Sequence, residues 1–89
     1  MASFSVRILK AASDDLERLD RIAAINIVKR IRRLVEHIDI LKPIALKGDL
    51  SGLFKIRDGD YRIIYEILRD EKLIIIIHAI GHRKDIYRR

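Results

Sequence analysis

The sequence predicts an α+β domain in which two helices pack on one face of a mainly antiparallel four-stranded sheet. An N-terminal segment alternates apolar and polar residues as a strand does, and a long stretch with helical periodicity follows it. Pro43 ends the helical stretch. Three strand-like segments joined by short turns complete the chain. We therefore expect the order β-α-α-β-β-β, with a short C-terminal helix or a tail.

Size and composition indicate a single domain covering residues 1–89. The chain is 49% hydrophobic and 36% charged, which is typical of a globular protein with one core. It has no cysteine, and its three histidines lack the spacing of metal ligands, so we expect no metal centre. No segment approaches the roughly 20 apolar residues that cross a bilayer, and no secretory signal is visible. A cytoplasmic protein without a membrane partner is the expectation.

The N-terminal half predicts one strand and a helical region. Residues 4–10 read as the strand, and Ser13 or Asp14 can cap the helix that follows. One helical face is apolar, with Leu16, Leu19, Ile27, Ile31, Leu34, Val35 and Ile38. No glycine or proline divides this region, so one long helix and a helical hairpin bending near residues 20–24 both remain open. A small domain buries a hairpin more easily, which favours the hairpin.

The strongest local signal is the hairpin in "GLFKIRDGDYRIIYEIL", residues 52–68. Asp58-Gly59 suits a type I′ turn. A two-residue loop at these positions places Lys55 opposite Arg62 and Arg57 close by. The opposite face is apolar and is expected to meet the helices; it carries Phe54, Ile56, Tyr61, Ile63 and Tyr65.

Two like charges placed opposite each other in a sheet destabilise it. A bound phosphate would turn that repulsion into shared attraction. The net charge of +6 and the sequence pI near 10 also favour a polyanionic partner. These observations predict that the polar face of the hairpin binds nucleic acid.

The last strand, residues 73–80, extends the same surface. With a two-residue turn at Asp70-Glu71, Arg62 neighbours Ala79, and His78 points into the core. The strand then delivers three side chains to the cationic face: His82, Arg83 and Tyr87.

Three elements of the C-terminal half resemble the RelE branch of the RelE/ParE toxin superfamily. They are "LKG" at residues 46–48, "GDYRIIY" at residues 59–65 and "GHRKDIY" at residues 81–87. Their order and spacing are those of the family, and the N-terminal half is similar in the type of its elements. The resemblance spans essentially the whole chain and implies a toxin of a type II toxin–antitoxin pair.

The resemblance implies a ribosome-dependent endoribonuclease that cuts mRNA in the decoding site. In such toxins the 2′-hydroxyl attacks the adjacent phosphate without a metal or other cofactor. The implied partners are the ribosome, mRNA and a cognate antitoxin whose acidic segment covers the basic face. The toxin and antitoxin are expected to form a higher hetero-oligomer.

Matched by position, the implied catalytic residues are Lys55, Arg57, Arg62, Arg83 and Tyr87, to which His82 is added from its place beside them. The predicted RNA-binding residues are Lys47, Lys55, Arg57, Arg62, Arg83, Lys84 and Arg88. Some relatives carry a further basic residue where this chain has Ala79.

The chemistry of RNA cleavage suggests a role for each group. Arg62 and Arg83 can hold phosphate oxygens in a bidentate fork and stabilise developing charge. The general base is Lys55 or His82, because arginine holds its proton too firmly and imidazole titrates near neutral pH. Tyr87 can stack on a base and transfer a proton.

Two rival functions remain. A ParE-type inhibitor of DNA gyrase has the same fold but needs no cluster of catalytic cations. A catalytically inactive relative would only bind nucleic acid or its antitoxin.

Overall fold

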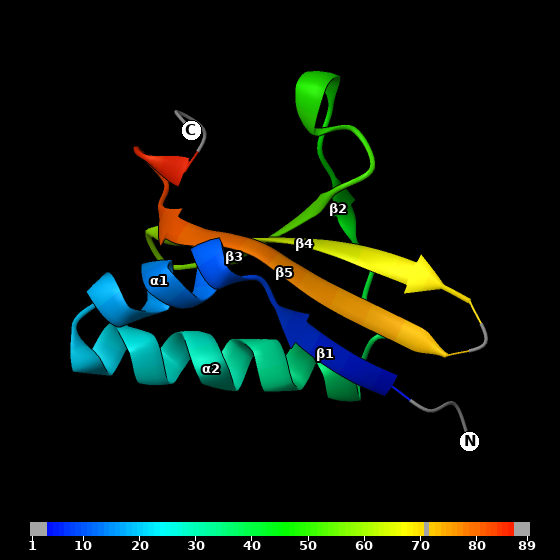
Figure 1. Ribbon diagram of the computed structural model, residues 1–89, viewed down its shortest axis with the longest axis horizontal. Coiled ribbons are helices and arrows are strands. Elements are labelled where there is room, and N and C mark those ends of the chain that lie inside the picture. Colours follow the sequence, from blue (N-terminus) through cyan, green and yellow to red (C-terminus); the bar gives the residue numbers. More distant parts are fainter. Residues whose placement is uncertain (1–3, 71, 87–89) are drawn as a thin grey trace.

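The computed structural model describes residues 4–70 and 72–86 as helices, strands and short connections (Figure 1). The elements in chain order are β1 (Phe4–Ile8), α1 (Lys10–Arg18), α2 (Arg21–Glu36), β2 (Ile44–Ala45), the 3-10 helix η1 (Gly48–Leu50), β3 (Phe54–Asp58), β4 (Tyr61–Arg69) and β5 (Leu73–His82). In the described part of the chain, no helix has the length and apolar character to cross a membrane.

The strands form one sheet in the order β1-β5-β4-β3-β2. β1 is parallel to β5, and the other neighbours are antiparallel. The helices lie on one side of the sheet (Figure 1), which confirms the predicted α+β class. The prediction of four strands was wrong by one, because β2 has only two residues and its pairing with Lys55 and Phe54 leaves no periodic pattern in the sequence.

The helical region is a hairpin, as favoured, with its break at Leu19 and Asp20. Asp20 caps α2, since its side chain accepts a hydrogen bond of 2.9 Å from the Ala23 amide. The predicted caps of the first helix were wrong. Ser13 and Asp14 lie inside α1, which starts earlier, from Leu9, without a side-chain cap.

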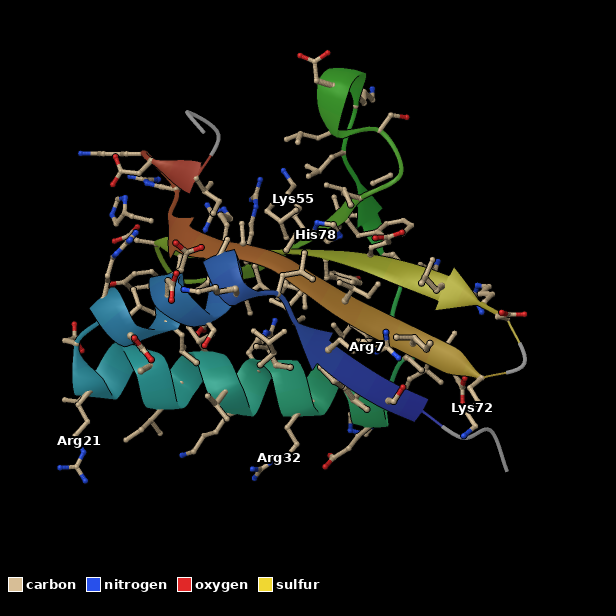
Figure 2. All side chains as sticks on the ribbon, in the orientation of Figure 1. Arg7, Arg21, Arg32, Lys55, Lys72 and His78 are labelled. Carbon is tan, nitrogen blue, oxygen red and sulfur yellow. The ribbon has the colours of Figure 1, made fainter. Side chains whose placement is uncertain are left out.

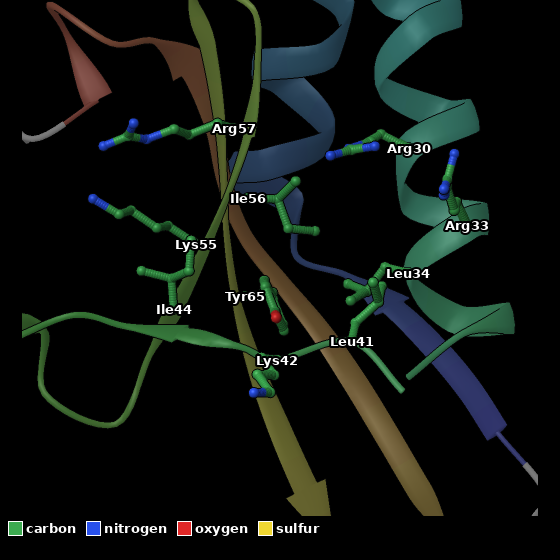
Figure 3. Close-up of a pocket in the computed structure, with 10 residues that line it drawn as sticks. All are labelled: Arg30, Arg33, Leu34, Leu41, Lys42, Ile44, Lys55, Ile56, Arg57 and Tyr65. Atoms are coloured by element: carbon green, nitrogen blue, oxygen red, sulfur yellow. The ribbon is translucent and has the colours of Figure 1, made fainter. Parts of the chain in front are cut away.

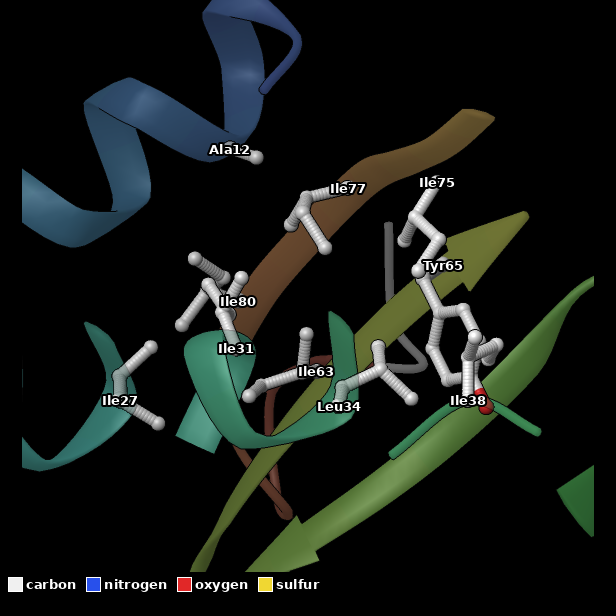
Figure 4. Packing of buried hydrophobic residues seen from close by; sticks show 10 residues of the cluster. All are labelled: Ala12, Ile27, Ile31, Leu34, Ile38, Ile63, Tyr65, Ile75, Ile77 and Ile80. Carbon is white, nitrogen blue, oxygen red and sulfur yellow. The ribbon is translucent and has the colours of Figure 1, made fainter. Parts of the chain in front are cut away.

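The core lies between the helices and the sheet (Figure 4). The predicted apolar stripe of α2 faces it, and Ile27 and Leu34 are almost completely buried. Tyr65 of β4 is 1% exposed, and burial raises the pKa of its hydroxyl. The remaining residues of the central cluster are Ala12, Ile31, Ile38, Ile63, Ile75, Ile77 and Ile80.

The pairing of β3 with β4 is shifted by two residues from the predicted register. Asp58 pairs with Tyr61, so the two-residue loop is Gly59-Asp60 and not Asp58-Gly59. Of the two loop residues only Gly59 has a positive φ, +60°, which is the sign pattern of a type II′ turn and not of type I′. Arg57 therefore stands opposite Arg62, in place of the predicted Lys55. A shift of two keeps every side chain on its predicted face.

The β4–β5 pairing contains a bulge. Tyr65 pairs with Ile77 and Ile64 with Ala79, which leaves His78 as the extra residue. Arg62 consequently pairs with Gly81, and the predicted pairing of Arg62 with Ala79 was wrong. The turn before β5 connects Arg69 to Leu73, one residue longer than predicted, and Glu71 within it lies outside the described residues.

Candidate functional site

The face of the sheet opposite the helices carries the predicted basic residues; we call it the open face. On it Arg57 and Arg62 stand directly opposite each other on β3 and β4. Lys55 follows one step along the same face, opposite Ile64. Directly opposed residues have Cβ atoms roughly 5 Å apart, so two guanidinium stems are held together at this point. Figure 2 shows Lys55 on the side of the sheet away from α2.

Arg62 is the most constrained of these side chains. It is only 9% exposed, and its Nη1 donates to the carbonyl oxygens of Gly59 and Tyr61, both at 2.8 Å. These contacts tie the guanidinium to the β3–β4 turn. No carboxylate of the described residues lies within ion-pair distance of it. A buried cation normally has an anionic partner, so this arrangement favours an external anion.

Arg83 follows β5 and is anchored to the same turn. Its amide donates to the Asp60 carbonyl at 2.7 Å, and its Nε lies 3.6 Å from Asp60 Oδ1. Both side chains of this ion pair are more than half exposed, so the pair is weak and can open toward a phosphate. Lys84, the next residue, is also exposed. We call Lys55, Arg57, Arg62 and Arg83 the cationic cluster.

His82 does not reach the open face as predicted. It pairs with Tyr61, whose side chain belongs to the helix-facing side, and the two rings meet edge to face at 5.9 Å. Its Nδ1 accepts a hydrogen bond of 3.1 Å from the Lys84 amide. Neutral imidazole then carries its proton on Nε2, and its acceptor nitrogen Nδ1 is occupied by this hydrogen bond. This geometry favours Lys55 over His82 as general base.

His78 was also predicted on the wrong face. The turn before β5 is one residue longer than predicted, so Ile77 faces the core and His78 lies on the open side, where its Nε2 lies 2.8 Å from Glu66 Oε1 (Figure 2 labels His78). Of the remaining predicted residues, Lys47 is exposed in the loop before η1. Tyr87 and Arg88 lie outside the described residues.

A second basic region was not anticipated from the sequence. A cavity of about 260 Å³ opens where β2 ends and leaves part of β3 without a neighbour. Figure 3 shows Arg30 and Arg33 of α2 on one side of it and Lys55 and Arg57 on the other. Its lining residues, which include no acid, are Arg30, Arg33, Leu34, Leu41, Lys42, Ile44, Lys55, Ile56, Arg57 and Tyr65. We call this cavity the basic groove. The run of basic residues on α2 was the available signal, but only the fold shows which of them face the sheet.

Two curated toxins of Mycobacterium tuberculosis (strain ATCC 25618 / H37Rv) are similar to this chain. Toxin RelG is 38% identical over 88 residues, which cover 97% of this chain and 98% of RelG. Toxin RelE is 38% identical over 87 residues, which cover 96% of this chain and 87% of that toxin. Residues 6–87 also match the family described as the ParE toxin of the type II toxin–antitoxin system, parDE.

Solved structures show the same fold. The RelBE2 toxin–antitoxin complex from Mycobacterium tuberculosis contains a chain with a TM-score of 0.78 and 28% identity, covering 92% of this chain and 100% of that chain. A mutant of the E. coli toxin RelE in the free state has a TM-score of 0.71 and 23% identity, covering 99% of this chain and 93% of that chain.

Proposed function

Because this chain belongs to the RelE/ParE superfamily of type II toxin–antitoxin toxins, within its RelE branch, we propose that it is a ribosome-dependent endoribonuclease. It cuts mRNA in the decoding site and thereby stops translation. The observation that carries this proposal is Arg62, a largely buried guanidinium held opposite Arg57 without a carboxylate partner among the described residues. A gyrase inhibitor or a passive binding protein has no need of this arrangement.

The reaction we propose is attack by the RNA's own 2′-hydroxyl. Lys55, in its neutral form, takes the hydroxyl proton as the bond from O2′ to phosphorus forms and the bond from phosphorus to O5′ breaks. The 5′-oxygen leaves with a proton, for which Tyr87 remains the predicted donor. The products are a 2′,3′-cyclic phosphate and a 5′-hydroxyl.

The cationic cluster stabilises the charge that builds on the phosphate. Arg62 is pre-positioned by the two turn carbonyls, so it does not have to reorganise during the reaction. Arg83 is tied to the same turn through its backbone amide. Fixed donors of this kind are each worth roughly 100- to 1,000-fold in rate. Alignment of the RNA for in-line attack comes from its rigid setting in the ribosome.

The decisive measurement is cleavage of a defined mRNA by the purified protein, with and without translating ribosomes. We expect cuts in register with codons, mapped by primer extension, only when ribosomes are present. Cleavage of free RNA would contradict the dependence on ribosomes. Absence of cleavage in both reactions, together with inhibition of gyrase-driven DNA supercoiling, would establish the ParE-type alternative.

We further propose that a cognate antitoxin neutralises the toxin by laying an acidic segment along the basic groove. Antitoxins accompany the toxin in the solved RelBE2 complex. In this chain the groove combines five basic side chains with apolar ones such as Leu41 and Ile44, and residues 56–58 of β3 pair with no other described strand on that edge. Such a surface suits a segment that mixes carboxylates with apolar residues.

Charge reversal tests this contact. We expect Arg30→Glu/Arg33→Glu to weaken binding of the cognate antitoxin at least tenfold by calorimetry, with a reduced dependence on salt. Arg21→Glu/Arg32→Glu carries the same change in charge on the same helix, and both side chains point away from the sheet (Figure 2). Equal losses in the two double variants would mean that general charge, and not the groove, holds the antitoxin.

A further inference from the structure

A second cavity lies on the open face directly beside the cationic cluster. Its volume is about 450 Å³, within the range of small-molecule sites. The floor and walls are mainly apolar, and three polar side chains stand among them. The lining residues are Lys47, Asp49, Leu50, Leu53, Ile64, His78, Ala79 and Ile86.

The strand register fixes the distance from this cavity to the cationic cluster. Ile64 and Ala79 are paired neighbours in β4 and β5, and Lys55 is the partner of Ile64 on the other side. Arg62 lies two residues before Ile64 on β4 and on the same face. A nucleotide whose phosphate binds Arg62 is therefore close enough to place its base in the cavity. Ile86 is buried over Gly81 and also lines the cavity.

One of the polar groups of the cavity lies at the bulge in β5. His78 is the extra residue of β5, and its Nε2 lies 2.8 Å from Glu66 Oε1, with each side chain about one-third exposed. An ionised carboxylate only accepts hydrogen bonds, so Nε2 carries the proton and Nδ1 of the neutral ring is left as an acceptor. The Glu66 contact fixes this tautomer and the orientation of the ring.

We propose that this cavity receives one unstacked nucleobase of the RNA, adjacent to the phosphate on the cationic cluster. The proposal rests on the endoribonuclease function and names the part of the site that reads sequence. Apolar side chains pack against the base faces, as in other proteins that bind single-stranded RNA. His78 Nδ1 accepts from the exocyclic amino group of adenine, cytosine or guanine, which uracil lacks. The toxin therefore disfavours uracil at this one position.

Two variants test the proposal in the ribosomal cleavage reaction, with an mRNA that presents every codon. We expect Ala79→Leu, which fills the cavity, to lower cleavage at least tenfold at all sites. We expect His78→Ala to retain cleavage but to remove the preference against uracil, which we estimate at about tenfold for one hydrogen bond. The matched controls are Ala11→Leu on exposed α1 and His37→Ala at the exposed end of α2. Melting temperatures establish that all four variants fold.

A binding measurement separates this proposal from the function on which it rests. Short single-stranded RNAs that differ only in one base, adenine or uracil, are titrated into isotope-labelled wild-type protein. We expect larger NMR shifts at Ile64, His78 and Ala79 with adenine. If the wild type cuts mRNA but Ala79→Leu and His78→Ala cut with an unchanged pattern, the cavity reads no base. If those variants instead lose only antitoxin binding, it belongs to the antitoxin. If the wild type does not cut, the NMR contrast alone decides whether a base binds here.

Discussion

Replacing Arg57 and Arg83 together by alanine is expected to lower ribosome-dependent mRNA cleavage at least 100-fold. Both side chains are exposed, so their loss leaves the core intact. Each is placed where it can meet the charge on the reacting phosphate, and removal of one such donor typically costs this much. The two losses are expected to be less than additive, because the residues act on one phosphate. The rate is measured as single-turnover cleavage on programmed ribosomes.

Antitoxin affinity and toxicity complete this test. Arg57 also lines the basic groove, so the double variant is expected to bind the antitoxin somewhat more weakly while losing toxicity almost entirely. The control Arg21→Ala/Arg32→Ala removes the same charge from the outer side of α2 and is expected to remain toxic (Figure 2). A fully toxic Arg57→Ala/Arg83→Ala variant would falsify the nuclease assignment and favour the alternative, a ParE-type inhibitor of DNA gyrase.

Arg62 is less suitable for this test than Arg57 and Arg83. Alanine there would remove two hydrogen bonds to the turn carbonyls as well as a charge that we propose to be catalytic. A loss of activity in that variant would mix folding with chemistry. Arg57 and Arg83 separate the two effects because their side chains make no comparable contacts within the described part of the chain. The structure thus favours Arg57 and Arg83 over Arg62 as the residues to replace.

The face of each hairpin residue could be predicted, but the partner of each could not. Side chains alternate between the two faces with a period of two. The apolar residues Phe54, Ile56 and Ile63 therefore face the helices with either of the two possible turns. The turn itself depends on whether Gly59 takes the first or the second loop position. Asp58-Gly59 and Gly59-Asp60 differ by two registers, and both are compatible with the same faces. Pattern alone cannot choose between them.

The length of the turn before β5 marks a sharper limit of prediction from sequence. The two-residue turn predicted at Asp70-Glu71 places His78 in the core by continuous alternation, and nothing in "IIIIHAI" signals the longer turn or the extra residue. The actual position is decided by contacts that are distant in sequence, among them the pairing of His78 with Glu66. The longer turn and the bulge each shift the β4–β5 pairing by one residue, and together they place Gly81, and not Ala79, beside Arg62. The misplacement of His78 follows from the longer turn, and that of His82 from a strand that continues to His82 and does not end at Ile80.

A buried carboxylate supports the end of β5 that carries Arg83. Asp15 of α1 is 3% exposed, and its Oδ2 accepts a hydrogen bond of 3.0 Å from the Ile80 amide. β1 ends at Ile8, so beyond Ile77 no strand among the described residues pairs with this edge of β5. The Asp15 side chain takes the place of that strand at Ile80. It also lies 3.8 Å from the exposed Arg18 guanidinium, which contributes little.

Replacing Asp15 by alanine is therefore expected to lower the free energy of unfolding by roughly 2–3 kcal/mol, the usual range for a hydrogen bond to a charged group. For a domain of this size each kcal/mol corresponds to about 4–8 °C in melting temperature. Asp15→Asn keeps an oxygen acceptor and is expected to lose less. Asp14→Ala is the matched control: its carboxylate makes only the surface pair with Lys10 at 3.2 Å, so we expect a loss of at most about 0.5 kcal/mol.

Hydrogen exchange tells the proposed role of Asp15 from a general loss of stability. If the carboxylate holds the free edge of β5, the Ile80 amide exchanges faster in Asp15→Ala by more than the global change in stability allows. Ile75 and Ile77 lie on the same strand and pair with β1, so their amides then exchange faster only by the amount that the global loss of stability predicts. Uniform acceleration along β5 would mean that Asp15 stabilises the fold as a whole. A local effect would connect the first helix to the end of the sheet that carries the proposed cationic site, since Arg83 lies three residues beyond Ile80.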